Sequence, residues 1–148
     1  MRFSFIVLAT ALLISPVGFA DDALQLDLMG KPFNPQKEAV LNAVNMNAKY
    51  SEITQADRLS IEDLLLRISE ALADGKNIGA LDAQSRQNIE LNQEAVNKLL
   101  LKAYRDSRLV CTKEAPLGSN MMKRVCKTAA ARNRDNANVR ANGIKVNQ

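Results

Sequence analysis

Two cysteines, Cys111 and Cys126, are the residues of this 148-residue chain whose type and spacing point most directly to chemistry. They are its only cysteines, and fourteen residues separate them. Catalytic dithiols usually stand closer, as in Cys-x-x-Cys, so the spacing favours a structural disulfide, with a redox site as the alternative. The midpoint of the two cysteines falls between Gly118 and Ser119, inside the turn-rich segment 115–120. We therefore predict a hairpin over 108–128 that is closed by a cross-strand disulfide.

The register of this hairpin follows from its turn. Lys113 is expected opposite Arg124, Glu114 opposite Lys123, and Val110 opposite Lys127. The pairing of Lys113 with Arg124 brings like charges together, which is unfavourable unless the side chains splay into water or bind an anion.

Other residue types limit what the chain can catalyse. Without histidine there is no imidazole general base and no His-bearing metal site, and two cysteines cannot complete a structural zinc site. Adjacent residues of the Asp106-Ser107-Arg108 run point in different directions, and paired carboxylates on helices usually form a solvated face: Glu90 with Glu94, and Asp57 with Asp63. We predict no catalytic residues, no metal and no cofactor, and treat a hydrolase without histidine as the less favoured alternative.

Charge is distributed unevenly along the chain. Residues 21–97 hold 7 basic and 13 acidic groups, whereas residues 98–148 hold 12 basic and 3 acidic groups. Such asymmetry suggests either an anionic partner for the C-terminal part or a packing of the two parts against each other. We predict a contact surface on the hairpin and the segment after it: Lys113, Lys123, Arg124, Lys127, Arg132 and Arg134.

The alternative is that these charges only solvate the hairpin or neutralise the acidic helices of the same molecule. Met121 and Met122, beside the turn, add adaptable apolar surface to the predicted contact. Nucleic acid is not a predicted partner, because the aromatic side chains that stack on bases are missing from this region.

An export signal is predicted at residues 1–20. Arg2 is followed by an uncharged apolar run and by Gly18-Phe19-Ala20, which has small residues three and one positions before a cut after Ala20. An uncleaved membrane anchor is the rival interpretation, and Pro16 argues against it. Export to a periplasmic or secreted location also favours the disulfide, because disulfides persist in oxidising compartments.

Past the signal, we expect a mainly α fold: a bundle of three to four helices over 35–107 with a small disulfide hairpin, preceded by an extended leader at 21–34. The first helix is expected over about 35–48, with Asn34 as its N-cap and Pro35 at its first position. Thr54 and Asp57 predict a capping box for the second helix. The third helix is expected from Asp82 to about Arg105.

The second helix carries two apolar strips at helical spacing. The first predicts its core face: Ile61, Leu64, Leu65, Ile68, Ala71 and Leu72. The second strip, Leu59, Leu66 and Ala73, predicts a helix that is sandwiched between neighbours. Gly75 is expected to end this helix in a left-handed conformation.

Two amides, Asn92 and Gln93, project onto the apolar face of the third helix. A buried amide needs partners, so we expect the pair to hold a neighbouring loop or helix, with a ligand site as the alternative. After the hairpin, Thr128 is expected to cap a short helix that frays near Gly143 and leads into a disordered basic tail.

Several short motifs resemble a group of small secreted proteobacterial proteins of unassigned function. The shared motifs are an N-Q-E-x-V-N helix at 92–97, a D-S-R-x-x-C exit at 106–111, a G-S turn at 118–119, and a second cysteine followed by Lys127-Thr128. The resemblance covers about residues 55–130 and implies export and the disulfide hairpin, but no activity. We therefore expect an exported, non-enzymatic interaction or scaffold protein of the bacterial envelope. Its expected partner is an envelope protein, or alternatively an anionic surface such as lipid or polymer.

Overall fold

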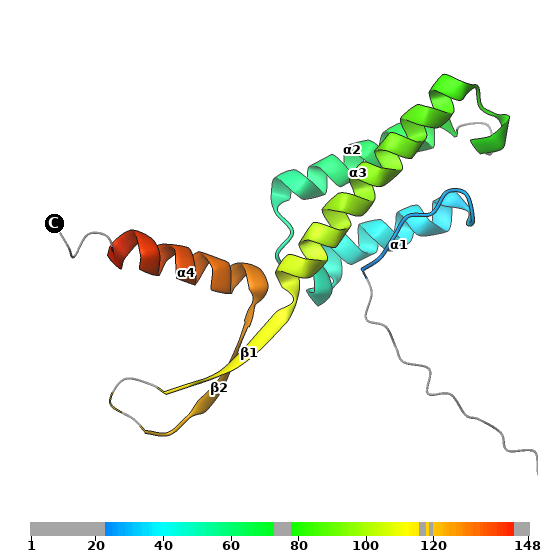
Figure 1. Cartoon of the computed structure of the whole chain (residues 1–148). Helices are drawn as coiled ribbons and strands as arrows, with labels where there is room; N and C mark the ends of the chain where they lie inside the picture. Colours follow the sequence, from blue (N-terminus) through cyan, green and yellow to red (C-terminus); the bar gives the residue numbers. More distant parts are fainter. Residues whose placement is uncertain (1–22, 73–77, 116–117, 119, 144–148) are drawn as a thin grey trace, which may run out of the picture.

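The computed structural model describes residues 23–72, 78–115, 118 and 120–143 (Figure 1). The predicted signal, Ala73, Gly75 and the tail after residue 143 lie outside these ranges. The protein is mainly helical and has a small two-stranded antiparallel hairpin, which confirms the predicted fold class. Its elements follow in the order α1 (Phe33–Met46), η1 (Ala48–Tyr50), α2 (Gln55–Ala71), η3 (Ile78–Ala80), α3 (Ala83–Ser107), β1 (Leu109–Glu114), β2 (Lys123–Thr128) and α4 (Ala129–Gly143).

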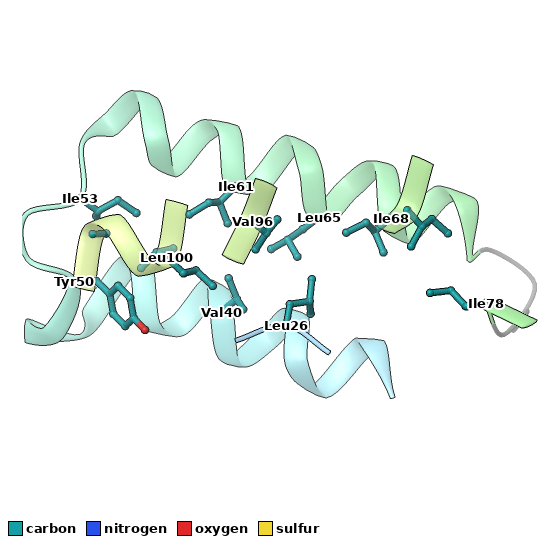
Figure 2. Close-up of a cluster of buried hydrophobic side chains, with 13 residues drawn as sticks. Leu26, Val40, Tyr50, Ile53, Ile61, Leu65, Ile68, Ile78, Val96 and Leu100 are labelled. Carbon is teal, nitrogen blue, oxygen red and sulfur yellow. The ribbon is translucent and has the colours of Figure 1, made fainter. Parts of the chain in front are cut away.

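The body of the protein consists of α1, α2 and α3, while the hairpin and α4 project from one end of it (Figure 1). The core lies between the three helices, where the predicted stripe of α2 faces residues of the other two (Figure 2). Three aliphatic side chains of α2 are almost fully enclosed, namely Ile61, Leu65 and Ile68. They pack in one cluster with Val40 and Val44 of α1 and with Ile89, Val96 and Leu100 of α3.

The prediction that α2 is sandwiched is wrong. Leu59 and Leu66 are 54% and 51% exposed. Polar contacts place both neighbours toward the core side of α2, because Arg58 donates to Asn45 of α1 and Lys102 of α3 pairs with Asp57. In the parts of the chain that the structure describes, no third helix covers the far side of α2. A strip of leucines at helical spacing therefore does not by itself show burial.

Polar side chains begin two of the body helices as the sequence predicts. Thr54 Oγ1 accepts a hydrogen bond from the N–H of Asp57 at 3.0 Å, and Asp82 Oδ1 accepts one from the N–H of Ser85 at 2.9 Å. Helix α1 differs from the prediction, because it begins at Phe33 with no side-chain cap. Instead, the amide of Gln36 donates to the carbonyl oxygens of Lys31 and Pro32 and so holds the chain where it enters the helix.

The leader has no helix or strand over 23–27, and it belongs to the body. Leu26 is 2% exposed and lies in the core cluster (Figure 2). Among the described residues no strand pairs with its backbone, and side chains provide the hydrogen bonds that a sheet neighbour would provide. Asn97 of α3 accepts from the N–H of Leu26 at 2.7 Å and donates to its carbonyl oxygen at 2.9 Å.

Three more side chains accept hydrogen bonds from N–H groups of the leader. Gln36 accepts from Asp27, Gln93 accepts from Leu28 at 3.0 Å, and the hydroxyl of Tyr50 accepts from Leu24 at 2.7 Å. The expectation that the amides of α3 hold a neighbouring loop is therefore confirmed for Gln93. Asn92 lies elsewhere, half-buried in a groove beside Arg67 of α2.

We expect Asn97→Ala to destabilise the protein by about 1–3 kcal/mol. The substitution leaves the N–H and the carbonyl of the buried residue Leu26 without their hydrogen-bonding partner. Urea unfolding followed by circular dichroism measures the loss. Lys98→Ala is the matched control, because Lys98 is the exposed neighbour of Asn97 and should change little. Equal stability of the two variants would show that the amide does not hold the leader.

Candidate contact surface

The hairpin forms in the predicted register. Cys111 lies opposite Cys126, Lys113 opposite Arg124, Glu114 opposite Lys123, and Val110 opposite Lys127. The two cysteines form a disulfide, which confirms the predicted pairing. Gly118, near the midpoint of the turn, has a φ of 79°, a conformation that favours glycine. Pro116, Leu117 and Ser119 of the predicted turn lie outside the described residues.

The two faces of the hairpin differ because side chains alternate along each strand. The open face carries the disulfide and, on the same side, Leu109, Lys113 and Arg124, all of which are exposed. The covered face carries Val110, Thr112 and Val125, all of which are half-buried. The side chains of Lys127 and Thr112 on the covered face bind residues of α4, whereas Cys111, Lys113 and Arg124 on the open face are exposed.

Helix α4 covers its face of the hairpin largely through Arg132. The guanidinium of this residue donates to the carbonyl oxygen of Val110 and to the hydroxyl of Thr112, and it lies 3.7 Å from a carboxylate oxygen of Glu114. Lys127 pairs with Asp135 of α4 at 2.7 Å, and this ion pair raises the pKa of Lys127 and lowers that of Asp135. These contacts fix the start of α4 against β1 and β2.

A second junction ties the hairpin and α4 to the body at Glu52, which lies in the loop before α2. Its carboxylate accepts hydrogen bonds from the hydroxyl of Thr128 and from both terminal nitrogens of Arg134. Its backbone N–H donates to the hydroxyl of Ser107 at 2.9 Å. The hydrogen bonds from Arg134, and next those from Thr128, lower the pKa of Glu52. One acidic residue therefore joins the body, the end of β2 and α4.

Three of the six predicted contact residues are thus engaged within the molecule. Lys127, Arg132 and Arg134 pair with Asp135, Glu114 and Glu52 of the same molecule, none of which lies on the acidic helices of the body. The sequence pattern did not indicate these ion pairs, because the acidic partners lie on the hairpin, on α4 and in a distant loop. For Lys113, Lys123 and Arg124, the described parts of the chain contain no ion pair and no side-chain hydrogen bond. The candidate contact surface narrows to these three cations.

A pocket lies at the base of the open face and was not predicted. It has a volume of about 350 Å³ and is lined by Ala48, Lys49, Tyr104, Ser107, Arg108 and Leu109. Its lining combines two cations with an aromatic ring and an aliphatic side chain. Arg108, which follows the last residue of α3, is one of these two cations. We call it the basal pocket.

Three of the residues that were considered for catalysis, Ser107, Asp57 and Asp63, have partners within the molecule. Ser107 is 6% exposed, and its hydroxyl already accepts from Glu52. Asp57 pairs with Lys102 at 2.6 Å, which lowers the pKa of Asp57, and Asp63 pairs with Arg67 at 2.9 Å. Glu90 and Glu94 are exposed on α3. No nucleophile with an adjacent base emerges from these groups.

Within the described ranges, no group of three or more potential ligand side chains is placed to hold a metal ion. Nor does any helix there have the length and apolar character needed to cross a membrane.

Comparisons with known proteins give no match to a family model, to a curated protein or to a solved structure. The resemblance to small secreted proteobacterial proteins stays a prediction from short motifs.

The Glu52 junction predicts a dependence on pH. Because the pKa of Glu52 is lower in the folded protein, its charge stabilises the fold above the usual glutamate pKa of ~4.3, and this stabilisation disappears as the pH falls through the folded value. We expect α4 to detach from the body on acidification, which hydrogen exchange at 129–134 would detect. In Glu52→Gln this step should be lost, with raised exchange already at neutral pH. Unchanged exchange in this variant would contradict the role of Glu52.

Proposed function

We propose that the protein is an exported, non-enzymatic interaction protein of the bacterial envelope, which contacts its partner through the open face of the hairpin. The observation that carries the proposal is the pair Lys113 and Arg124, held side by side on that face with no acidic partner in the described parts of the chain. Two adjacent like charges are unfavourable in the absence of a counter-charge. An anionic group on a partner would supply it.

The way in which the hairpin is held supports a contact role. A disulfide joins its strands, Arg132 braces its covered face, and Glu52 fixes its end to the body. A preformed element loses less conformational freedom on association than a flexible loop does, so more of the interaction energy remains for binding. The body would then serve to present the hairpin.

Export is part of this proposal and rests on the predicted signal at 1–20. The disulfide is compatible with an oxidising compartment. N-terminal sequencing of protein recovered from outside the cytoplasm should begin at Asp21. Recovery of protein that begins at Met1 would contradict cleavage of the signal.

Binding to an anionic envelope surface is the second candidate, and a separate observation favours it. Met121 and Met122, at the far end of the hairpin, are 74% and 60% exposed and adjoin Lys123. Apolar side chains next to cations are typical of elements that dip into the headgroup region of an anionic bilayer. In this case binding should weaken steeply as the salt concentration rises.

A pull-down from envelope extract tests the proposal. The bait is the mature protein, compared with the double variant Lys113→Gln/Arg124→Gln. Its matched control is Lys31→Gln/Lys98→Gln, which removes the same charge from exposed positions of the body. We expect the hairpin variant to lose the partner that the other two capture. Equal capture by all three proteins would exclude the open face, and binding of the wild type only to anionic vesicles would favour the second candidate.

A further inference from the structure

We infer that the open face binds an extended acidic peptide of the partner, with one carboxylate of that peptide seated in the basal pocket. This inference rests on the proposed function and specifies the chemistry of the partner. It follows from the position of the basal pocket at the base of the same face that carries Lys113 and Arg124.

The spacing of the cations fits an extended chain. Arg108 lines the pocket directly before β1, and Lys113 lies five residues further along the strand. At roughly 3.3 Å per residue, about 17 Å separate the two positions along the hairpin. An extended peptide of about six residues spans this distance, and its alternate side chains would face the hairpin. A single phosphate or one lipid headgroup reaches only one of the two positions.

The position of the pocket separates a peptide from a membrane. Its lining comes from the body as well as from the hairpin: Ala48 and Lys49 belong to η1, and Tyr104 and Ser107 belong to α3. Its lining residues therefore place the pocket at the junction between the hairpin and the helices. Figure 1 shows the hairpin projecting from the body at this junction. A flat bilayer can touch the end of the hairpin, but the projecting arm holds it away from this junction. A thin polypeptide enters the junction without hindrance.

The lining of the pocket fits a carboxylate on an apolar stem. The guanidinium of Arg108 can bind a carboxylate through two parallel hydrogen bonds, and Lys49 adds a second positive charge. Tyr104 and Leu109 supply aromatic and aliphatic surface for the carbon atoms of the ligand. A volume of about 350 Å³ suits one side chain or one chain terminus.

The nearby acidic residue does not oppose such a ligand. Glu52 lies in the loop that follows η1, and its charge is neutralised by Arg134, with a 2.8 Å contact between the two side chains. The charged side chains that line the pocket itself, Lys49 and Arg108, are both basic. Loss of Arg134 would leave the carboxylate of Glu52 without this partner near the entering peptide.

Fluorescence anisotropy with a defined probe tests the inference. The probe is a fluorescein-labelled six-residue peptide of alternating glutamate and leucine with a free C-terminal carboxylate. Its matched control has glutamine for glutamate and an amidated end. We expect the acidic probe to bind at low salt and the neutral probe to bind at least tenfold more weakly. Arg108→Gln and Lys113→Gln/Arg124→Gln should each raise the dissociation constant of the acidic probe about tenfold.

Two further variants make the result specific. Lys31→Gln/Lys98→Gln removes the same charge from the body and should leave the affinity within twofold of the wild type. Arg108→Lys keeps the charge but loses the two-pronged geometry, so its affinity should fall between those of wild type and Arg108→Gln. Circular dichroism should show all variants folded, because the side chains of Lys113 and Arg124 form no pair in the described structure.

Three outcomes would overturn the inference: no binding of the acidic probe, equal binding of the neutral probe, or equal weakening by the body variant. Binding of wild-type protein to phosphatidylglycerol vesicles without binding to the probe would assign the cations to a membrane instead. The pull-down tests the proposed function independently of the peptide probe. If the hairpin variant loses its envelope partner while the probe fails, the open face is a contact surface for other chemistry and only the acidic peptide is excluded.

Discussion

Leu65→Ala should lower the free energy of unfolding by about 2–5 kcal/mol. Leu65 is 1% exposed in the middle of α2, and it packs in the cluster that α1, α2 and α3 share (Figure 2). Removing the end of its side chain both forfeits the burial of those atoms and leaves a cavity that rigid helices fill only in part. Ile68→Ala should act in the same way, since Ile68 is fully buried one turn later.

The neighbouring residue provides the control. Leu66 has the same side chain as Leu65 but is 51% exposed, so Leu66→Ala should change stability by less than about 0.5 kcal/mol. Urea unfolding, followed by circular dichroism at 222 nm, measures the stability of both variants. Both substitutions replace leucine by alanine in α2, so they differ mainly in the burial of the side chain. A Leu66 variant that loses as much stability as the Leu65 variant would mean that a partner covers the far side of α2 in solution.

The double variant Cys111→Ser/Cys126→Ser is expected to lose about 3 kcal/mol, the value that chain entropy predicts for closing a loop of this length. The effect should be largest in the hairpin itself. A two-stranded sheet is marginal in water without further support, and here the cysteines, Lys113 and Arg124 on the open face are exposed. The helices of the body bury their own core and should depend much less on the disulfide.

Hydrogen exchange separates these two regions. In the double variant, amides of 109–114 and 123–128 should exchange much faster, whereas those of α2 and α3 should keep most of their protection. Loss of protection throughout the chain would show that the disulfide supports the whole fold. Titration of the folded wild-type protein should find no free thiol, and two reactive thiols would contradict the disulfide in the native protein.

Features that depend on residues close together in the sequence could be predicted, whereas features that depend on distant residues could not. The hairpin register was predictable because one turn and two cysteines define it locally, and the core stripe of α2 was predictable from spacing alone. The burial of Leu26 was not, because its partner Asn97 is 71 residues away. Asn97 carried one usable signal: it follows Gln93 by four residues, and so lies one turn further along nearly the same side of α3.

The contact surface shows the same division. The exposure of Lys113 and Arg124 could be predicted, because a short hairpin places these like charges opposite each other. The neutralisation of Arg134 by Glu52 could not be predicted, because the two residues are 82 positions apart. The basal pocket was also beyond the sequence, because it forms only where η1, the end of α3 and β1 meet. Local patterns locate the cations, and only the tertiary arrangement shows which of them stay unpaired.

The attachment of the leader sets an order of events during biosynthesis. A polypeptide is made from its N-terminus, so residues 24–28 emerge long before their partners Gln93 and Asn97 exist. Until α3 has been completed, the backbone groups and the leucines of this segment stay open to solvent, to proteases and to holding chaperones. Closure of the body must then wait for a loop of about seventy residues, which slows folding relative to the local pairing of the hairpin. In a chain that crosses a membrane unfolded, such late closure would keep the nascent protein competent for transport.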